Sequence, residues 1–361
     1  MLRSVELKKF TVFEDARVDF SPGINVFLGA NATGKTHAMK LFYGLLRAWK
    51  NFESGEPGVQ RRPSSQLGEV IKAKLAAVFR PDDGKVGRLV RRGRGKSKSS
   101  VDLMITGGRI GFTMSNQGNV NIVNRDSTDI PASIFLPARE VLSIYPGFLA
   151  AYQNRELAFD ETYYDICLAL SGSPLRGPRG EAASALWRPL GDHLRANVSL
   201  EGNTFYVSSE EDGIIEAHLV AEGFRKIASL MHLIANGSLM KNAILFWDEP
   251  EANLNPKLIK IVADFLLGLA VGGVQIVIAT HDYLLTNELS LQAEYQTEEV
   301  QRAPIQFFSF YRAEDHSVGI QQGDTLADLR QNPIMEEFEA LYNREQCLFQ
   351  QEQPITIPGN T

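Results

Sequence analysis

An α/β fold, with helices on both faces of a mainly parallel sheet, is the architecture that the sequence predicts, and two regions predict it. Near the N-terminus, the apolar run INVFL precedes a glycine-bounded loop, after which apolar residues repeat at helical spacing from Thr36 to about Phe52. Beyond residue 222 the order is a helix, the run AILFW, a helix starting at Pro256, and the run VQIVIAT. Alternation of helices with short apolar strands is typical of such a sheet.

Between these regions the pattern predicts an antiparallel β arm and a helical insertion. The first 20 residues alternate as strands do, and residues from about 75 to 136 read as short strands separated by Gly and Asn turns. From 143 to 195 the pattern is mainly helical, and a small meander of strands follows. We therefore expect four segments: an N-terminal part with the loop and the arm (1–142), the helical insertion with its meander (143–219), a C-terminal part (220–345), and a disordered tail (346–361).

Composition gives few clues to partners. The formal net charge is −6, so the chain as a whole has no basic field for nucleic acid. Residues 85–98, however, carry seven basic residues and no acid, which fits either contact with nucleic acid phosphates or a solvated hairpin tip. Two distant cysteines predict neither a disulfide framework nor a zinc site, and the apolar stretches are too interrupted to span a membrane. We expect a cytoplasmic protein.

The segment GANATGKT, from Gly29 to Thr36, fits the phosphate-binding pattern G-x-x-x-x-G-K-[ST], and it lies between a predicted strand and a predicted helix. The two glycines allow the backbone to curl so that its N–H groups face phosphates. Lys35 is expected to reach the β- and γ-phosphates, and the Thr36 hydroxyl to ligate Mg²⁺. The predicted nucleotide contacts in this loop are Gly29, Ala30, Asn31, Ala32, Thr33, Gly34, Lys35, Thr36 and the following His37.

Adjacent acids, Asp248 and Glu249, end the apolar strand in ILFWDEPEANLNP. Asp248 is expected to hold the Mg²⁺ of a nucleotide together with Thr36, and Glu249 to orient and partly deprotonate the water that attacks the γ-phosphate. The next predicted strand, VQIVIAT, ends at His281, which at the carboxyl edge of a neighbouring strand can contact the same phosphate. Lys35, Glu249 and His281 are therefore the predicted catalytic residues.

Together, PGINVFLGANATGKT, DEPEANLNP and IVIATHD resemble the ABC-type AAA family of P-loop ATPases, specifically its OLD-like and RecF-like members. The resemblance covers roughly residues 1–50 and 220–345. It implies a P-loop NTPase fold of ABC-ATPase type, with ATP and Mg²⁺ as cofactors. It also implies a homodimer with ATP at the interface, and it leaves open whether dimers assemble further.

In this family a signature segment of one protomer completes the nucleotide site of the other. The corresponding segment here is AEGFRKIASL, in which the usual serine is replaced by Ala221, so the resemblance carries over only Gly223. Asn253 and Asn255, in the turn after the acids, are candidate cross-interface residues. Where the family has a glutamine-bearing switch, this chain has Arg139 and Glu140, which could contact phosphate and approach the metal or simply pair with each other.

The favoured functional hypothesis is an ATP-driven dimeric switch that controls a separately encoded effector, such as a nuclease or toxin, in antiphage defence. The sequence contains no D-x-D, so we expect the TOPRIM nuclease domain of full OLD-type enzymes to be missing. The alternative is a RecF-like DNA-repair ATPase that loads onto DNA and uses residues 85–98 to bind it. A third hypothesis, the ATPase subunit of a membrane transporter, fits less well because the signature is degenerate.

Overall fold

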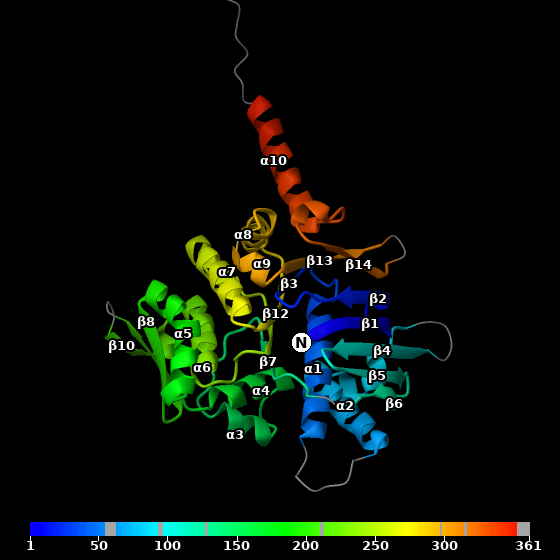
Figure 1. Ribbon diagram of the computed structural model, residues 1–361. Coiled ribbons are helices and arrows are strands. Elements are labelled where there is room, and N and C mark those ends of the chain that lie inside the picture. The colour runs from blue at the N-terminus through cyan, green and yellow to red at the C-terminus, as the bar shows by residue number, and fades with distance from the viewer. Residues whose placement is uncertain are drawn as a thin grey trace, which may run out of the picture.

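A computed structural model describes residues 1–54, 63–92, 97–126, 129–209, 213–296, 298–313 and 316–351. Its centre is a six-stranded sheet (Figure 1). The strand order is β14 (Val318–Gly323), β13 (Ile305–Arg312), β3 (Ile24–Gly29), β12 (Gln275–Thr280), β11 (Ile244–Asp248) and β7 (Ser133–Leu136). The five strands from β13 to β7 are parallel, and only β14 runs antiparallel to its neighbour. The predicted mixed sheet with a parallel core is confirmed.

Both faces of this sheet are covered, which explains why β3, β7, β11 and β12 consist entirely of buried residues. Alternate residues of a strand point to opposite faces. On β3, Ile24, Val26 and Leu28 join the apolar core that contains α6 (Glu222–Ala235) and α7 (Pro256–Val271). Phe27 points into a second core, shared with α1 (Lys35–Glu53).

The second core is closed by an antiparallel sheet, in the order β2 (Phe13–Asp19), β1 (Leu2–Phe10), β4 (Lys98–Ile105), β5 (Gly108–Ser115) and β6 (Val120–Arg125). The antiparallel strands predicted in the middle of the chain are therefore present. They do not form a free-standing arm, because β4 pairs along β1 and extends the N-terminal hairpin into one sheet. The phosphate-loop helix α1 lies between this sheet and the central one (Figure 1).

The prediction that short strands begin at about residue 75 was wrong. Residues 75–79 belong to α2 (Ser64–Phe79), which packs along α1, and 82–89 form two short 3₁₀ helices, η1 (Asp82–Gly84) and η2 (Val86–Leu89). Leu67, Ile71, Leu75 and Val78 are buried and recur at helical spacing. The glycine and proline residues on either side of this helix obscured its pattern in the sequence.

The helical insertion contains α3 (Phe148–Gln153), α4 (Glu161–Leu170) and α5 (Gly177–Leu194), followed by the meander β8 (Ala196–Glu201), β9 (Thr204–Ser209), β10 (Gly213–Glu216) and the 3₁₀ turn η3 (Ala217–Leu219). Two polar contacts join it to α1. Lys40 Nζ lies 2.8 Å from Asp160 Oδ2, and Asp165 Oδ2 accepts hydrogen bonds from Tyr43 (2.7 Å) and Lys74 (2.5 Å). Asp165 thus joins α1, α2 and α4 at one buried point.

The C-terminal part contains α8 (Tyr283–Glu294), α9 (Glu298–Arg302), the 3₁₀ turn η4 (Leu326–Asp328) and α10 (Pro333–Gln351). Helix α10 projects away from the rest of the molecule (Figure 1). Residues 346–351 are therefore helical, in contrast to the predicted disordered tail, and 352–361 lie outside the described residues. Within the described ranges, the helices are too short or too polar to cross a membrane.

Candidate functional site

The predicted phosphate loop connects β3 to α1, and both of its glycines are required by its geometry. Gly29 has φ +146°, and a Cβ there would lie 2.3 Å from the carbonyl oxygen of Phe310. Gly34 has φ +91°, and a Cβ there would lie 2.5 Å from Val12 Cγ2. Positive φ is costly for other residues, so the sequence can form this loop only with glycine at both positions. The loop ends where the N-terminus of α1 begins, which is the geometry that favours anions.

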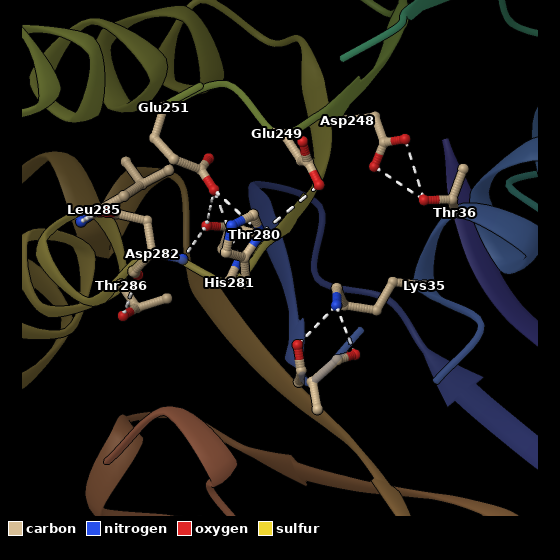
Figure 2. A network of polar contacts seen from close by, with 12 residues as sticks. Lys35, Thr36, Asp248, Glu249, Glu251, Thr280, His281, Asp282, Leu285 and Thr286 are labelled. Atoms are coloured by element: carbon tan, nitrogen blue, oxygen red, sulfur yellow. Dashed lines mark hydrogen bonds and ion pairs between the residues drawn. The ribbon is translucent and has the colours of Figure 1, made fainter. Parts of the chain in front are cut away.

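Lys35 and Thr36, the first two residues of α1, point toward the carboxyl edge of the sheet (Figure 2). The Lys35 ammonium folds over the loop and donates hydrogen bonds to the carbonyl oxygens of Gly29 (2.6 Å) and Ala30 (3.1 Å). Burial lowers the pKa of Lys35, while Asp248 and Glu249 oppose that shift. Lys35 is thus a buried cation beside two acids, as expected of a group that neutralises phosphate charge.

Asp248 ends β11 directly opposite Thr36. The Thr36 hydroxyl donates to both carboxylate oxygens of Asp248, at 3.1 and 3.0 Å. Burial raises the pKa of Asp248 to about 6, although the Thr36 hydrogen bond works in the other direction. A hydroxyl and a carboxylate at this separation are the oxygen donors that Mg²⁺ prefers, and a cation between them would remove the cost of burying the charge. The residues present therefore fit the predicted metal.

Glu249 lies beyond the end of the strand with φ +50°, a conformation that turns it away from the strand direction. Its backbone is fixed from two sides, because its N–H donates to the Ala279 carbonyl of β12 (2.8 Å) and its carbonyl accepts from Lys226 Nζ of α6 (3.2 Å). The Glu249 carboxylate lies 3.6 Å from His281 Nδ1 (Figure 2). Both side chains remain partly exposed, so a substrate can reach them.

Sequence reasoning missed two residues of this site. Glu251 is buried, and its Oε1 accepts from the Thr280 hydroxyl (2.7 Å) and from the His281 N–H (3.4 Å), so it holds the end of β12 in place (Figure 2). Burial raises the pKa of Glu251. Lys226 is also buried, which lowers its pKa, and it anchors the Glu249 carbonyl. Their only sequence signals were an acid in DEPEA and a lysine on the apolar face of a helix.

The signature-like segment begins α6. Gly223 lies in the first turn of that helix, and a Cβ there would meet the carbonyl oxygen of Asn253 at 2.6 Å, so glycine permits α6 to pack on the turn after the acids. Ala221 is the N-cap residue and provides no side-chain cap. Asn255, a candidate cross-interface residue, caps α7 of its own chain by accepting from the Leu258 N–H at 3.0 Å.

The structure also places three other predicted residues. The buried Glu140 carboxylate pairs with Arg225 Nε of α6 at 2.8 Å and accepts from Ser143, so it is already engaged away from the predicted metal ligands. Arg139 is exposed beside it, in the connection after β7, and is not its partner. His37 is exposed, and its ring packs edge-on against Phe79 at 5.7 Å between centroids.

The basic stretch 85–98 is largely neutralised where it can be described. Lys85 pairs with Asp83 (2.8 Å), Arg88 with Asp82 (3.3 Å) and Arg91 with Glu14 (3.1 Å). Arg92 and Lys98 are exposed, whereas Arg94 and Lys96 lie outside the described residues. These acids precede the stretch or come from β2, so the sequence window of 85–98 concealed them.

Comparison with known proteins agrees with this geometry. Residues 148–287 match the family described as "AAA domain, putative AbiEii toxin, Type IV TA system", a span that includes Asp248, Glu249 and His281. A DNA replication and repair protein RecF of Lactococcus lactis subsp. cremoris is 27% identical over 125 residues, 34% of each chain. RecF of Lactobacillus gasseri is 36% identical over 87 residues, 21% of this chain and 23% of that one. The matched part thus spans about a third or less of these relatives.

A solved structure supports the fold over nearly the whole chain. The SMC head bound to the C-terminal winged-helix domain of ScpA superposes with a TM-score of 0.50 at 13% identity, covering 90% of this chain and 98% of that one. At this identity the similarity establishes the architecture alone. The protein therefore has the α/β P-loop ATPase fold of the SMC and RecF type, as the sequence predicted.

Proposed function

We propose that the protein binds ATP with Mg²⁺ and hydrolyses it. The observation that carries this proposal is that five side chains from three separate elements converge at one edge of the sheet: Lys35 and Thr36 from the start of α1, Asp248 and Glu249 from the end of β11, and His281 from the end of β12. Cation, metal-ligand and base are thereby arranged around one position where a γ-phosphate would lie.

Each side chain has a distinct role in the proposed reaction. Lys35 exchanges its bonds to the loop carbonyls for bonds to phosphate oxygens, and Thr36 and Asp248 hold the metal. Bound Mg²⁺ supplies neutralisation of phosphate charge. Glu249 orients the attacking water and accepts its proton, while His281, 3.6 Å from that carboxylate, contacts the transferred phosphoryl group.

We further propose that ATP brings two protomers together. The N-terminus of α6 carries Gly223, without a side chain over its backbone N–H, and α6 also contacts Glu249 through Lys226. The N-terminus of α6 could bind a phosphate of the nucleotide held by the partner subunit. The same helix fixes the Glu249 backbone of its own subunit through Lys226. This arrangement supports a dimer whose closure and hydrolysis are coupled.

The proposed role of this ATPase is to control a separately encoded effector in antiphage defence. The family description that includes a toxin of a toxin–antitoxin system supports this proposal. The second candidate is a DNA-repair ATPase, favoured by the similarity to RecF. The two differ in the binding partner and share the nucleotide site.

Replacing Glu249 with glutamine tests the ATPase. Because glutamine cannot accept the proton of the attacking water, phosphate release should fall by about a factor of 10² to 10⁴. ATP binding should persist, and an ATP-dependent dimer should become longer-lived in light scattering. Replacing the exposed Glu298 of α9 with glutamine is the matched control and should leave turnover unchanged. Unchanged turnover in the Glu249 variant would contradict the proposed mechanism.

The effector and DNA candidates are separated by purifying tagged Glu249→Gln protein with its neighbouring genes in ATP and Mg²⁺. A stoichiometric neighbouring gene product supports effector control. For the DNA candidate, duplex affinity should fall steeply with salt, and replacing exposed Arg92 and Lys98 with glutamate should weaken it further. If affinity is insensitive to both changes, DNA loading through this stretch is excluded.

A further inference from the structure

Helix α10 exposes a long apolar stripe. Every residue from 335 to 350 is exposed, and six large apolar side chains among them are between 38% and 63% accessible. These residues, here called the α10 stripe, are Met335, Phe338, Leu341, Tyr342, Leu348 and Phe349. The helix extends from the body of the molecule, attached at its first turns, where the Phe338 ring stacks on Tyr283 at 3.9 Å (Figure 1). A single projecting helix with this much exposed apolar surface is typical of an element that has a partner.

The spacing of the α10 stripe identifies the kind of partner. Phe338, Leu341 and Leu348 follow a and d positions of a heptad, and Met335, Tyr342 and Phe349 repeat every seven residues at the adjoining e position. All six therefore lie on one side of the helix. A stripe made of a, d and e positions fits another helix packed along its length.

The charges beside the stripe indicate that the partner is a second α10 helix in antiparallel orientation. Glu337 and Arg344 are seven residues apart, both at g positions, and both are exposed. In an antiparallel pair of helices g positions face g positions, so a second α10 would place its Arg344 opposite Glu337 and its Glu337 opposite Arg344. A parallel pair would instead place both charges beside the apolar e positions.

The same antiparallel register aligns four of the six apolar residues, while Leu348 and Phe349 lie beyond the paired segment. When Glu337 faces Arg344 of the partner subunit, Phe338 faces Leu341 of the partner subunit, and Met335 faces Tyr342 of the partner subunit. Each of these pairs occurs twice, as two-fold symmetry requires. Glu345, the one charged residue at an a position, falls at the end of the paired segment.

We propose that α10 is a self-association surface, which pairs antiparallel with α10 of a second copy of this chain. The stripe and the charges that form the pair belong to α10 alone, and the phosphate loop and α6 are separate elements. The contact therefore needs no nucleotide. It is distinct from the proposed ATP-dependent contact through the N-terminus of α6.

The test is sedimentation equilibrium of the full chain without nucleotide. Wild-type protein should show twice the monomer mass, and Leu341→Glu should weaken self-association by at least about tenfold, because it places a charge in the centre of the stripe. Glu337→Arg and Arg344→Glu should each weaken it by about threefold to tenfold, because each creates two like-charge pairs. The double variant Glu337→Arg/Arg344→Glu should recover wild-type affinity. Glu339→Arg, at an exposed b position away from the stripe, is the matched control and should have no effect.

Helix content by circular dichroism and the melting temperature show that each variant is folded. A wild-type protein that stays monomeric at about 100 µM, where even modest affinity populates a dimer, overturns the proposal. So does a Leu341→Glu variant that remains a dimer. Failure of the charge swap to restore affinity overturns the antiparallel pairing. A chain without ATPase activity that passes these tests would refute the proposed enzymatic function and leave this inference standing.

Discussion

Replacing Asp248 with asparagine is expected to stabilise the nucleotide-free protein while abolishing its response to Mg²⁺–ATP. The carboxylate is buried at the end of β11, where burial raises its pKa to about 6 from its ordinary value of 3.8. A carboxyl group with a higher pKa in the folded state holds its proton more tightly when folded. The free energy of unfolding is therefore highest at low pH, where Asp248 is protonated. This stability is lost as pH rises from 3.8 to about 6 and the carboxyl group ionises.

The size of the effect follows from that pKa difference. At about 1.4 kcal/mol per pKa unit, ionised Asp248 costs about 3 kcal/mol above pH 7, and about half of that at pH 5. Asparagine has nearly the same shape and can still accept the Thr36 hydroxyl, so the variant should recover this free energy at neutral pH. The gain should shrink as pH is lowered.

Urea denaturation in EDTA at pH 7.5 and pH 5 measures the free energy of unfolding of both proteins. Asp264→Asn, at an exposed position on α7, is the matched control and should change stability by less than about 0.5 kcal/mol. A second measurement, thermal melting with Mg²⁺ and ATP, should raise the melting temperature of wild type but not of Asp248→Asn. If the variant is less stable than wild type at pH 7.5, or if its gain does not depend on pH, the burial argument is refuted.

Three further substitutions test other parts of the structure. Glu251→Ala should lower the rate of ATP turnover about tenfold without changing KM, because it releases the backbone of His281. Glu251→Gln keeps a hydrogen-bond acceptor and should retain most of the activity. Equal loss of activity in both variants would contradict this role. Gly34→Ala should abolish ATP binding, measured by calorimetry, because of its positive φ and the lack of space for a Cβ. Glu140→Ala should destabilise the fold by about 3 kcal/mol in urea denaturation, because the largely buried Arg225 guanidinium loses its carboxylate partner and keeps only its bond to the Val220 carbonyl. A loss below about 1 kcal/mol would argue against that contact.

Features encoded by local spacing were predictable from the sequence. The phosphate loop has its glycines, lysine and threonine within eight residues, and its backbone fixes their relative positions. Asp248 and His281 could be placed together because parallel strands end at the same edge of a sheet, and the structure brings these strand ends together next to Thr36. The functions of these residues remain predictions that the experiments above can test.

Features that depend on tertiary contacts were not predictable. Lys226 and Glu251 looked like ordinary members of a helix and a turn, and only the fold reveals that each is buried against the residues that end β11 and β12. The partner of Glu140 could not be recognised either, because Arg225 is 85 residues away in the sequence. The acid partners of the basic stretch were hidden for the same reason, since the acid that pairs with Arg91 lies on β2.

The contacts of α1 with the helical insertion have a mechanical consequence. Lys40 and Tyr43 lie one and two turns beyond the phosphate loop, and they are bound to Asp160 at the start of α4 and to Asp165 within it. Helix α1, which begins at the phosphate loop, is thus bound through its first turns to α4 of the helical insertion. Any movement of α1 on nucleotide binding would therefore have to be followed by α4, or these two contacts would break. The insertion is therefore where a neighbouring protein could sense the nucleotide state without touching the nucleotide.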